Sequence, residues 1–177
     1  AGAVIRPTDL IALAARLHSA GGFIGSHLAG SLLNRGFRVR ALVRPSSDMR
    51  WIKGLDIELV SGSLQDNSFL EQAASGVDYI FHLAGAVKAK DPKDFYLHNT
   101  RATMNLARAA MTAAPGLKRF LFASSQAAAG PSAGAGDYVD ETRTPRPITW
   151  YGASKLAAEE ALRALPALPL VIVRAAP

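Results

Sequence analysis

Residues 19–44 read "SAGGFIGSHLAGSLLNRGFRVRALVR", two close glycines that lead into a helical pattern and then into a β-branched run. At the spacing of Gly22 and Gly25, one glycine lets the backbone approach a pyrophosphate and the next lets a helix pack closely on a strand. Phe23 and Ile24 lie between them, where a helix N-terminus favours an anion. The stretch predicts a dinucleotide-binding turn, although glycines at such a junction suit an ordinary turn equally well.

The residues before this turn do not match the pattern expected of a dinucleotide-binding fold. Ser19 stands where the tightest turn of a G-x-x-G-x-x-G pattern needs glycine, and a strained backbone there costs on the order of 1–3 kcal/mol. The preceding "LIALAARLH" is rich in Leu and Ala and suits a helix better than a β-branched first strand. We therefore expect residues 1–20 to be an atypical segment in place of the first strand, such as a frameshift would produce, followed by a nucleotide-binding domain over 21–177. A genuine variant in which Ser19 tolerates the turn is the alternative.

The rest of the chain alternates short β-branched runs with longer stretches of helical period, which is typical of βαβ units. Strands are expected within 37–43, 56–62, 77–84, 118–125 and 168–176. Helices are expected over 26–35, near 48–53, and over 68–74, 94–113 and 150–165. With one more strand before Gly21, the pattern predicts an α/β fold, a doubly wound parallel sheet of strand order 3-2-1-4-5-6. The Gly- and Pro-rich segment 127–147 is expected to be a long loop that serves a site.

Composition excludes several classes of protein. The chain has 177 residues, 49% of them apolar, which suits one domain, and it has no cysteine for a disulfide framework or a thiolate metal site. No apolar run reaches the roughly 20 residues that cross a bilayer. The net charge of +6 comes from scattered basic residues, unlike a nucleic-acid surface. We expect a cytoplasmic protein with a small-molecule substrate, and no nucleic-acid, membrane or metal partner.

The segment "WYGASKLAAEEALRAL" places Tyr151 and Lys155 one turn apart on one helix face. An ammonium group near a phenol lowers the phenol's pKa and suits it to proton transfer near neutral pH. An exposed helical face with no special role is the alternative. Ser124 and Ser125 end the strand before the long loop, where they either face a site or cap the next turn.

Five motifs occur in order: the glycine turn, "FHLAGA", "HNTRATMNL", the serine pair and Y-x-x-x-K. Together they resemble the extended short-chain dehydrogenase/reductases over about residues 21–177. The resemblance implies that Tyr151 acts as acid and base, that Lys155 holds the nicotinamide ribose, and that Ser125 orients the substrate oxygen. Ser124 would support Ser125.

The same resemblance implies further contacts. His82, Leu83, Ala84 and Ala86 would line the cofactor where the fourth strand ends. Asn99 would position the lysine and a proton-relay water. A packed core histidine is the alternative for His82, and a helix-surface amide is the alternative for Asn99.

Two features bear on the cofactor. Family members that prefer NAD usually carry an acidic residue at the end of the second strand. This chain has Arg44 there, which can pair with a 2′-phosphate, so NADP is slightly favoured over NAD; a solvated arginine is the alternative. After the third strand, Ser63 replaces an aspartate that the family often has near adenine, with Leu64 beside it.

The residues directly after the serine pair narrow the reaction. "QAAAG" over 126–130 lacks the Asp-Glu pair of the family's sugar dehydratases, which leaves epimerisation or carbonyl/alcohol redox chemistry, on a nucleotide sugar or related compound. Family members continue into a C-terminal substrate lobe that is absent from this chain. A non-catalytic cofactor-binding sensor or scaffold is therefore the alternative. The resemblance also implies a homodimer in which the Ala-rich helices over 102–114 and 154–165 pair, because alanine permits close helix approach. Packing of these helices within one monomer is the alternative.

Overall fold

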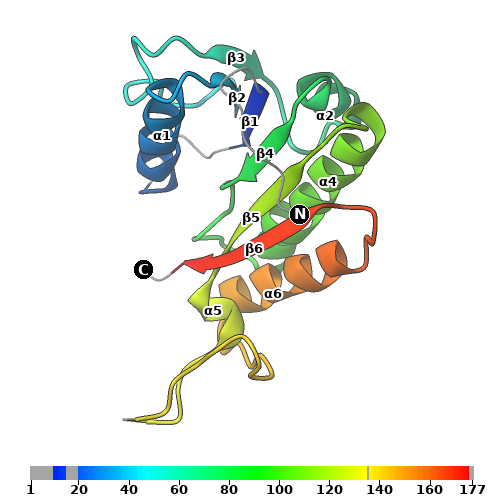
Figure 1. Ribbon diagram of the computed structural model, residues 1–177. Coiled ribbons are helices and arrows are strands. Elements are labelled where there is room, and N and C mark those ends of the chain that lie inside the picture. The colour runs from blue at the N-terminus through cyan, green and yellow to red at the C-terminus, as the bar shows by residue number, and fades with distance from the viewer. Residues whose placement is uncertain (1–9, 15–19, 135, 176–177) are drawn as a thin grey trace.

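The computed structural model describes residues 10–14, 20–134 and 136–175. Their core is one six-stranded parallel sheet of order β3-β2-β1-β4-β5-β6 (Figure 1). This order confirms the predicted doubly wound topology. The strands are β1 (Leu10–Ala14), β2 (Arg38–Val43), β3 (Glu58–Ser61), β4 (Tyr79–His82), β5 (Arg119–Ser125) and β6 (Leu170–Ala175).

Helices cover both faces of the sheet. They are α1 (Ala20–Leu33), α2 (Asn67–Ala74), α3 (Pro92–Phe95), the π-helical η1 (Tyr96–Arg101), α4 (Ala102–Ala113), α5 (Gln126–Ala129) and α6 (Trp150–Arg163). Helices α2, α4 and α6 bury one face in a cluster that includes Phe120 and Phe122. Helix α1 packs on the opposite face around Ile11 and Val39, and Figure 1 shows it across the sheet from α4 and α6. No helix in the described part of the chain is both long and apolar enough to cross a membrane.

The Leu- and Ala-rich stretch before the glycine turn forms a strand, although its local preference favours a helix. Leu10–Ala14 is β1, paired with β2 and β4, where one more strand was expected. Ile11 is fully buried between them. Strand preference depends on neighbours, and a slot between two strands outweighs the helical preference of Leu and Ala. Ser19 and its turn lie outside the described residues, so the origin of residues 1–20 stays a prediction.

Three helical expectations also change. Helix α1 begins at Ala20, so Gly22 and Gly25 lie inside its first two turns. The short helix expected near 48–53 is wrong, because this segment forms turns: Asp48 accepts a hydrogen bond from the Arg50 amide, and Gly54 has a φ of 85°. The helix expected over 94–113 is interrupted by the π-helical segment η1.

The two ends of the long loop between α5 and α6 are joined by a backbone hydrogen bond. The Arg146 amide donates to the Ala129 carbonyl at 2.9 Å. Gly130, at a φ of 88°, lies so close to Arg146 that a Cβ there would be 2.1 Å from its carbonyl oxygen. Gly152 of α6 is equally close to Ala127 of α5. These contacts fix the start of α6 against the end of β5.

Candidate active site

The carboxyl ends of β2, β3 and β4 open into a cleft of about 260 Å³. Its described lining includes five residues predicted to bind a cofactor: Arg44, Ser63, Leu64, Ala84 and Ala86. Parallel strands present their carboxyl ends at one edge, which is where this fold binds ligands. Residue 63 follows β3, and residues 84 and 86 follow β4 about twenty positions later; the parallel sheet brings both segments to the same cleft.

The cleft lining carries polar and cationic groups of the kind that bind the nucleotide end of a dinucleotide. The Arg44 guanidinium is exposed and forms no ion pair with any described residue, so it is free to meet a phosphate. The Arg44 amide donates to the Ser47 hydroxyl at 3.0 Å, which shapes the turn after β2. Gly62 packs against the Phe69 ring, leaving no room for a Cβ. The donor groups, cationic side chain and apolar floor are those that such a ligand requires.

The Asn99 side chain connects the cleft lining at Ala86 to helix α6. This side chain is fully buried, not on a helix surface. Its Oδ1 accepts from the Ala86 amide at 2.6 Å, and its Nδ2 donates to the Ala86 carbonyl at 3.0 Å and to the Ser154 hydroxyl at 2.9 Å. A Cβ at Gly85 would lie 3.3 Å from the Asn99 Oδ1 and 3.6 Å from the Lys155 Nζ. The side chains of Asn99 and Lys155 therefore both pack against the backbone of Gly85, which lines the cleft.

Lys155 is held at the end of β5. Its Nζ donates to the Ala123 carbonyl at 2.6 Å and lies 4.2 Å from the centre of the Phe122 ring. Burial lowers the pKa of this ammonium group to about 8, while the Glu159 carboxylate acts in the opposite direction. With this pKa the ammonium form still predominates at neutral pH, so Lys155 carries a buried positive charge there.

Tyr151 lies one turn before Lys155 on α6 and is partly exposed. Its ring packs edge-on against Phe95, with centroids 6.3 Å apart. The Ser154 hydroxyl, which accepts from Asn99, donates to the Tyr151 carbonyl at 2.7 Å. One chain of hydrogen bonds therefore joins Asn99 to the helix backbone that carries both predicted catalytic residues.

Ser124 and Ser125 make different contacts at the end of β5. Ser125 is the N-cap of α5 and accepts from the Ala127 amide at 3.2 Å. It is partly exposed, so its hydroxyl can also face a ligand. Ser124 is buried and donates to Glu159 at 2.5 Å. This bond fastens the end of β5 to α6, and a contact of Ser124 with a cofactor stays a prediction.

Two other residues predicted to bind the cofactor, His82 and Leu83, are not among the residues that line this cleft. His82 is fully buried, hydrogen-bonded to Thr103 at 2.8 Å and stacked on Phe122. Its side chain is thus a packed core histidine. Leu83 packs against the core on the α1 side. The glycine-turn residues Gly22, Phe23, Ile24 and Gly25 lie in the first two turns of α1, and their contact with a pyrophosphate stays a prediction.

Three residues of this region escaped the sequence patterns: Gly85, Ser154 and Glu159. Each acts through a contact with a distant segment, as when Ser154 meets Asn99 across 55 positions. The i, i+4 spacing of Lys155 and Glu159 was the one local signal available. Among the described residues, no group of three or more His, Asp or Glu side chains could hold a metal ion.

Comparisons with known proteins agree with this geometry. The sequence profile of the NAD dependent epimerase/dehydratase family matches residues 20–175. The ceramide reductase of Caulobacter vibrioides is 34% identical over 152 residues, which are 85% of this chain and 42% of that protein. The crystal structure of gox2253 is 34% identical with a TM-score of 0.82, over 94% of this chain and 51% of that one.

A UDP-glucuronic acid 4-epimerase from Bacillus cereus, solved in complex with NAD, is 25% identical with a TM-score of 0.77, over 94% of this chain and 56% of that one. The chain spans about half the length of the relatives that it matches. The matched range runs from α1 to β6, and the serine pair, Asn99 and the Y-x-x-x-K motif lie within it. The chain belongs to the NAD dependent epimerase/dehydratase family, within the extended short-chain dehydrogenase/reductases.

Proposed function

We propose that the protein transfers hydride between a nicotinamide dinucleotide and a carbonyl or alcohol, and that Tyr151 moves the accompanying proton. The observation that carries this proposal is the buried Lys155 ammonium, anchored to the Ala123 carbonyl one helical turn from Tyr151. A positive charge fixed at this point favours the phenolate form of the tyrosine. A phenol so placed can give or accept a proton as the substrate oxygen changes charge.

Each neighbouring residue has a role in this reaction. Ser125 orients the substrate oxygen, and Lys155 holds the nicotinamide ribose. Asn99 keeps the cleft wall at Ala86 aligned with α6 through its three hydrogen bonds. The nicotinamide, when bound, supplies or accepts the hydride.

The substrate is an alcohol or carbonyl compound, with a nucleotide sugar as the leading class. The sugar epimerase relative supports a nucleotide sugar, whereas the ceramide reductase relative supports simple carbonyl reduction. Gln126 and Ala127 cannot supply an acid and a base for dehydration. We therefore propose epimerisation or redox chemistry without loss of water.

The test follows nicotinamide absorbance while the protein, expressed from its complete gene, meets a panel of nucleotide sugars, aldehydes and ketones. Turnover is expected, and a Tyr151→Phe variant should lose roughly 10²–10⁴-fold, as positioned acid/base groups do. A variant that keeps its rate within a few-fold would remove Tyr151 from the mechanism. Cofactor binding without any turnover would instead favour the non-catalytic sensor or scaffold.

We propose NADP as the preferred cofactor, because Arg44 is exposed at the end of β2 and free of ion pairs with described residues. Titrations of NADPH and NADH should show tighter binding of NADPH, and an Arg44→Ala variant should lose most of that difference. Equal affinities of the wild type for the two cofactors would contradict the role of Arg44.

The proposed assembly is a homodimer through α4 and α6, located in the cytoplasm. Both helices are rich in alanine, which permits close helix packing, and Met111 is exposed on α4. Sedimentation at micromolar concentration should show a dimer. A monomer at this concentration would count against the assembly.

A further inference from the structure

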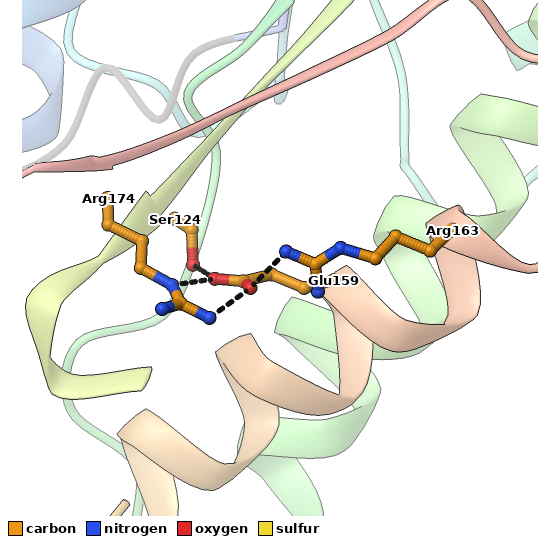
Figure 2. A network of polar contacts seen from close by, with 4 residues as sticks. All are labelled: Ser124, Glu159, Arg163 and Arg174. Atoms are coloured by element: carbon orange, nitrogen blue, oxygen red, sulfur yellow. Dashed lines mark hydrogen bonds and ion pairs between the residues drawn. The ribbon is translucent and has the colours of Figure 1, made fainter. Parts of the chain in front are cut away.

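The carboxylate of Glu159 lies at the centre of a network of polar contacts with Ser124, Arg163 and Arg174 (Figure 2). On α6, Glu159 follows Lys155 by one helical turn. Its side chain has no exposed surface. Oε1 accepts from the Ser124 hydroxyl at 2.5 Å and from Arg174 Nε at 3.0 Å, and Oε2 accepts from Arg174 Nη2 at 2.8 Å and from Arg163 Nη2 at 3.1 Å. A carboxylate with this many charge-assisted bonds is rigidly placed.

The partners of Glu159 come from the ends of two strands. Ser124 of β5 and Arg174 of β6 are register partners in the sheet, so their side chains leave the same face toward α6. The residues flanking Ser124 belong to the candidate active site: the Ala123 carbonyl accepts from Lys155, and Ser125 caps α5. Glu159 thus fixes the strand segment from which two elements of the site project.

The charge of Glu159 is maintained despite its burial. Burial raises the pKa of its carboxyl, but hydrogen bonds from Arg174 and Ser124 outweigh that effect and hold the pKa below its ordinary value. A carboxylate near Lys155 stabilises the ammonium form against the cost of burial.

We propose that Glu159 is a positioning residue: it fastens the ends of β5 and β6 to α6 and supplies the buried negative charge that keeps the Lys155 ammonium protonated beside Tyr151. This role rests on the proposed function, because it serves the lysine that supports the tyrosine. A clamp that was purely structural would hold the strands without affecting the charge of Lys155.

Several titratable or charged groups reach this region. They are Tyr151, Lys155, Glu159 and Arg163 from α6, His82 from β4, Arg174 from β6 and Glu141 from the long loop, which acts on Arg174. Glu159 is the one carboxylate among the described residues that acts on Lys155. Loss of its charge should therefore let Lys155 deprotonate at lower pH.

The experiment follows the ¹³Cε resonance of Lys155 by NMR in ¹³C-lysine-labelled protein expressed from its complete gene. The chain has six lysines, and a Lys155→Arg variant assigns the signal. In wild type the midpoint is expected at about 8. In Glu159→Gln it should fall below the wild-type value, and the basic limb of the pH profile of kcat should move to lower pH with it.

Matched variants separate this effect from loss of packing. Arg163→Gln removes the partner whose side chain is 52% exposed and keeps the carboxylate, so the midpoint should not fall. Glu159→Asp keeps a negative charge and should give a midpoint above that of Glu159→Gln. If Glu159→Gln does not fold because Arg174 is left without a counter-charge, the double variant Glu159→Gln/Arg174→Met removes both charges. It should show a smaller fall, because the loss of the Arg174 cation acts in the opposite direction.

An unchanged midpoint in both Glu159→Gln and the double variant would overturn the proposal, as would an equal fall in Arg163→Gln. The titration needs no substrate, so it decides the role of Glu159 toward Lys155 even if no turnover is found. Absence of turnover in the wild type would count against the proposed function alone.

Discussion

Replacing Asn99 by alanine should destabilise the protein strongly, because three hydrogen bonds end on this one side chain. A hydrogen bond contributes about 1 kcal/mol net, and a buried group left without its partner adds about 1–3 kcal/mol. The Ala86 amide and carbonyl and the Ser154 hydroxyl all lose a partner. We therefore expect Asn99→Ala to lower the free energy of unfolding by about 3–5 kcal/mol.

The control for this variant is Asn105→Ala. Asn105 lies on the next helix, α4, is partly buried and makes one such bond, to the Leu64 carbonyl at 3.1 Å. Its loss should cost about 1 kcal/mol. Urea unfolding followed by tryptophan fluorescence and far-UV circular dichroism measures both. A loss for Asn99→Ala no greater than that for Asn105→Ala would refute the central place given to Asn99.

Three further predictions concern α6. Burial lowers the pKa of Lys155 from 10.5 to about 8. Between these two pH values the unfolded chain binds more protons than the folded protein, so the free energy of unfolding should rise with pH by up to about 3 kcal/mol. Urea unfolding of a Lys155→Met variant over the same pH range should lack this rise. Gly152→Ala, whose Cβ would lie 2.1 Å from the Ala127 carbonyl oxygen, should lower the melting temperature, whereas Gly30→Ala, with open space around it, should raise it slightly. Thr149→Ala removes the N-cap bond to the Gly152 amide and should cost about 1 kcal/mol in urea unfolding, while Thr149→Ser should keep most of it.

The strand order could be predicted because alternation of strands and helices leaves few parallel topologies. The central strand could not, since Leu10–Ala14 has no β-branched pattern beyond Ile11 and owes its strand conformation to pairing with β2 and β4. Local sequence preference is weak where a segment is enclosed on both sides.

The candidate site could be predicted in part for a similar reason. Arg44 and Ala86 come shortly after strands, so their place at the carboxyl edge is a consequence of the topology alone. The partners of Asn99 and Glu159 could not be foreseen, because their bonds join segments 55 and 35 positions apart. For His82 the sequence left open a core position or a place beside the cofactor. The structure buries its ring against Phe122 with a hydrogen bond to Thr103, two residues far from it in the sequence.

The most direct test of a nicotinamide dinucleotide site at this edge is hydrogen exchange with and without saturating NADPH or NADH, read by mass spectrometry on the protein expressed from its complete gene. Peptides over 42–47, 62–66 and 83–89 contain most of the residues that line the cleft. We predict that the cofactor slows exchange in all three, and that NADPH protects the peptide with Arg44 more than NADH does. Unchanged exchange in these peptides at saturating cofactor, or protection confined to other parts of the chain, would contradict a cofactor site in this cleft.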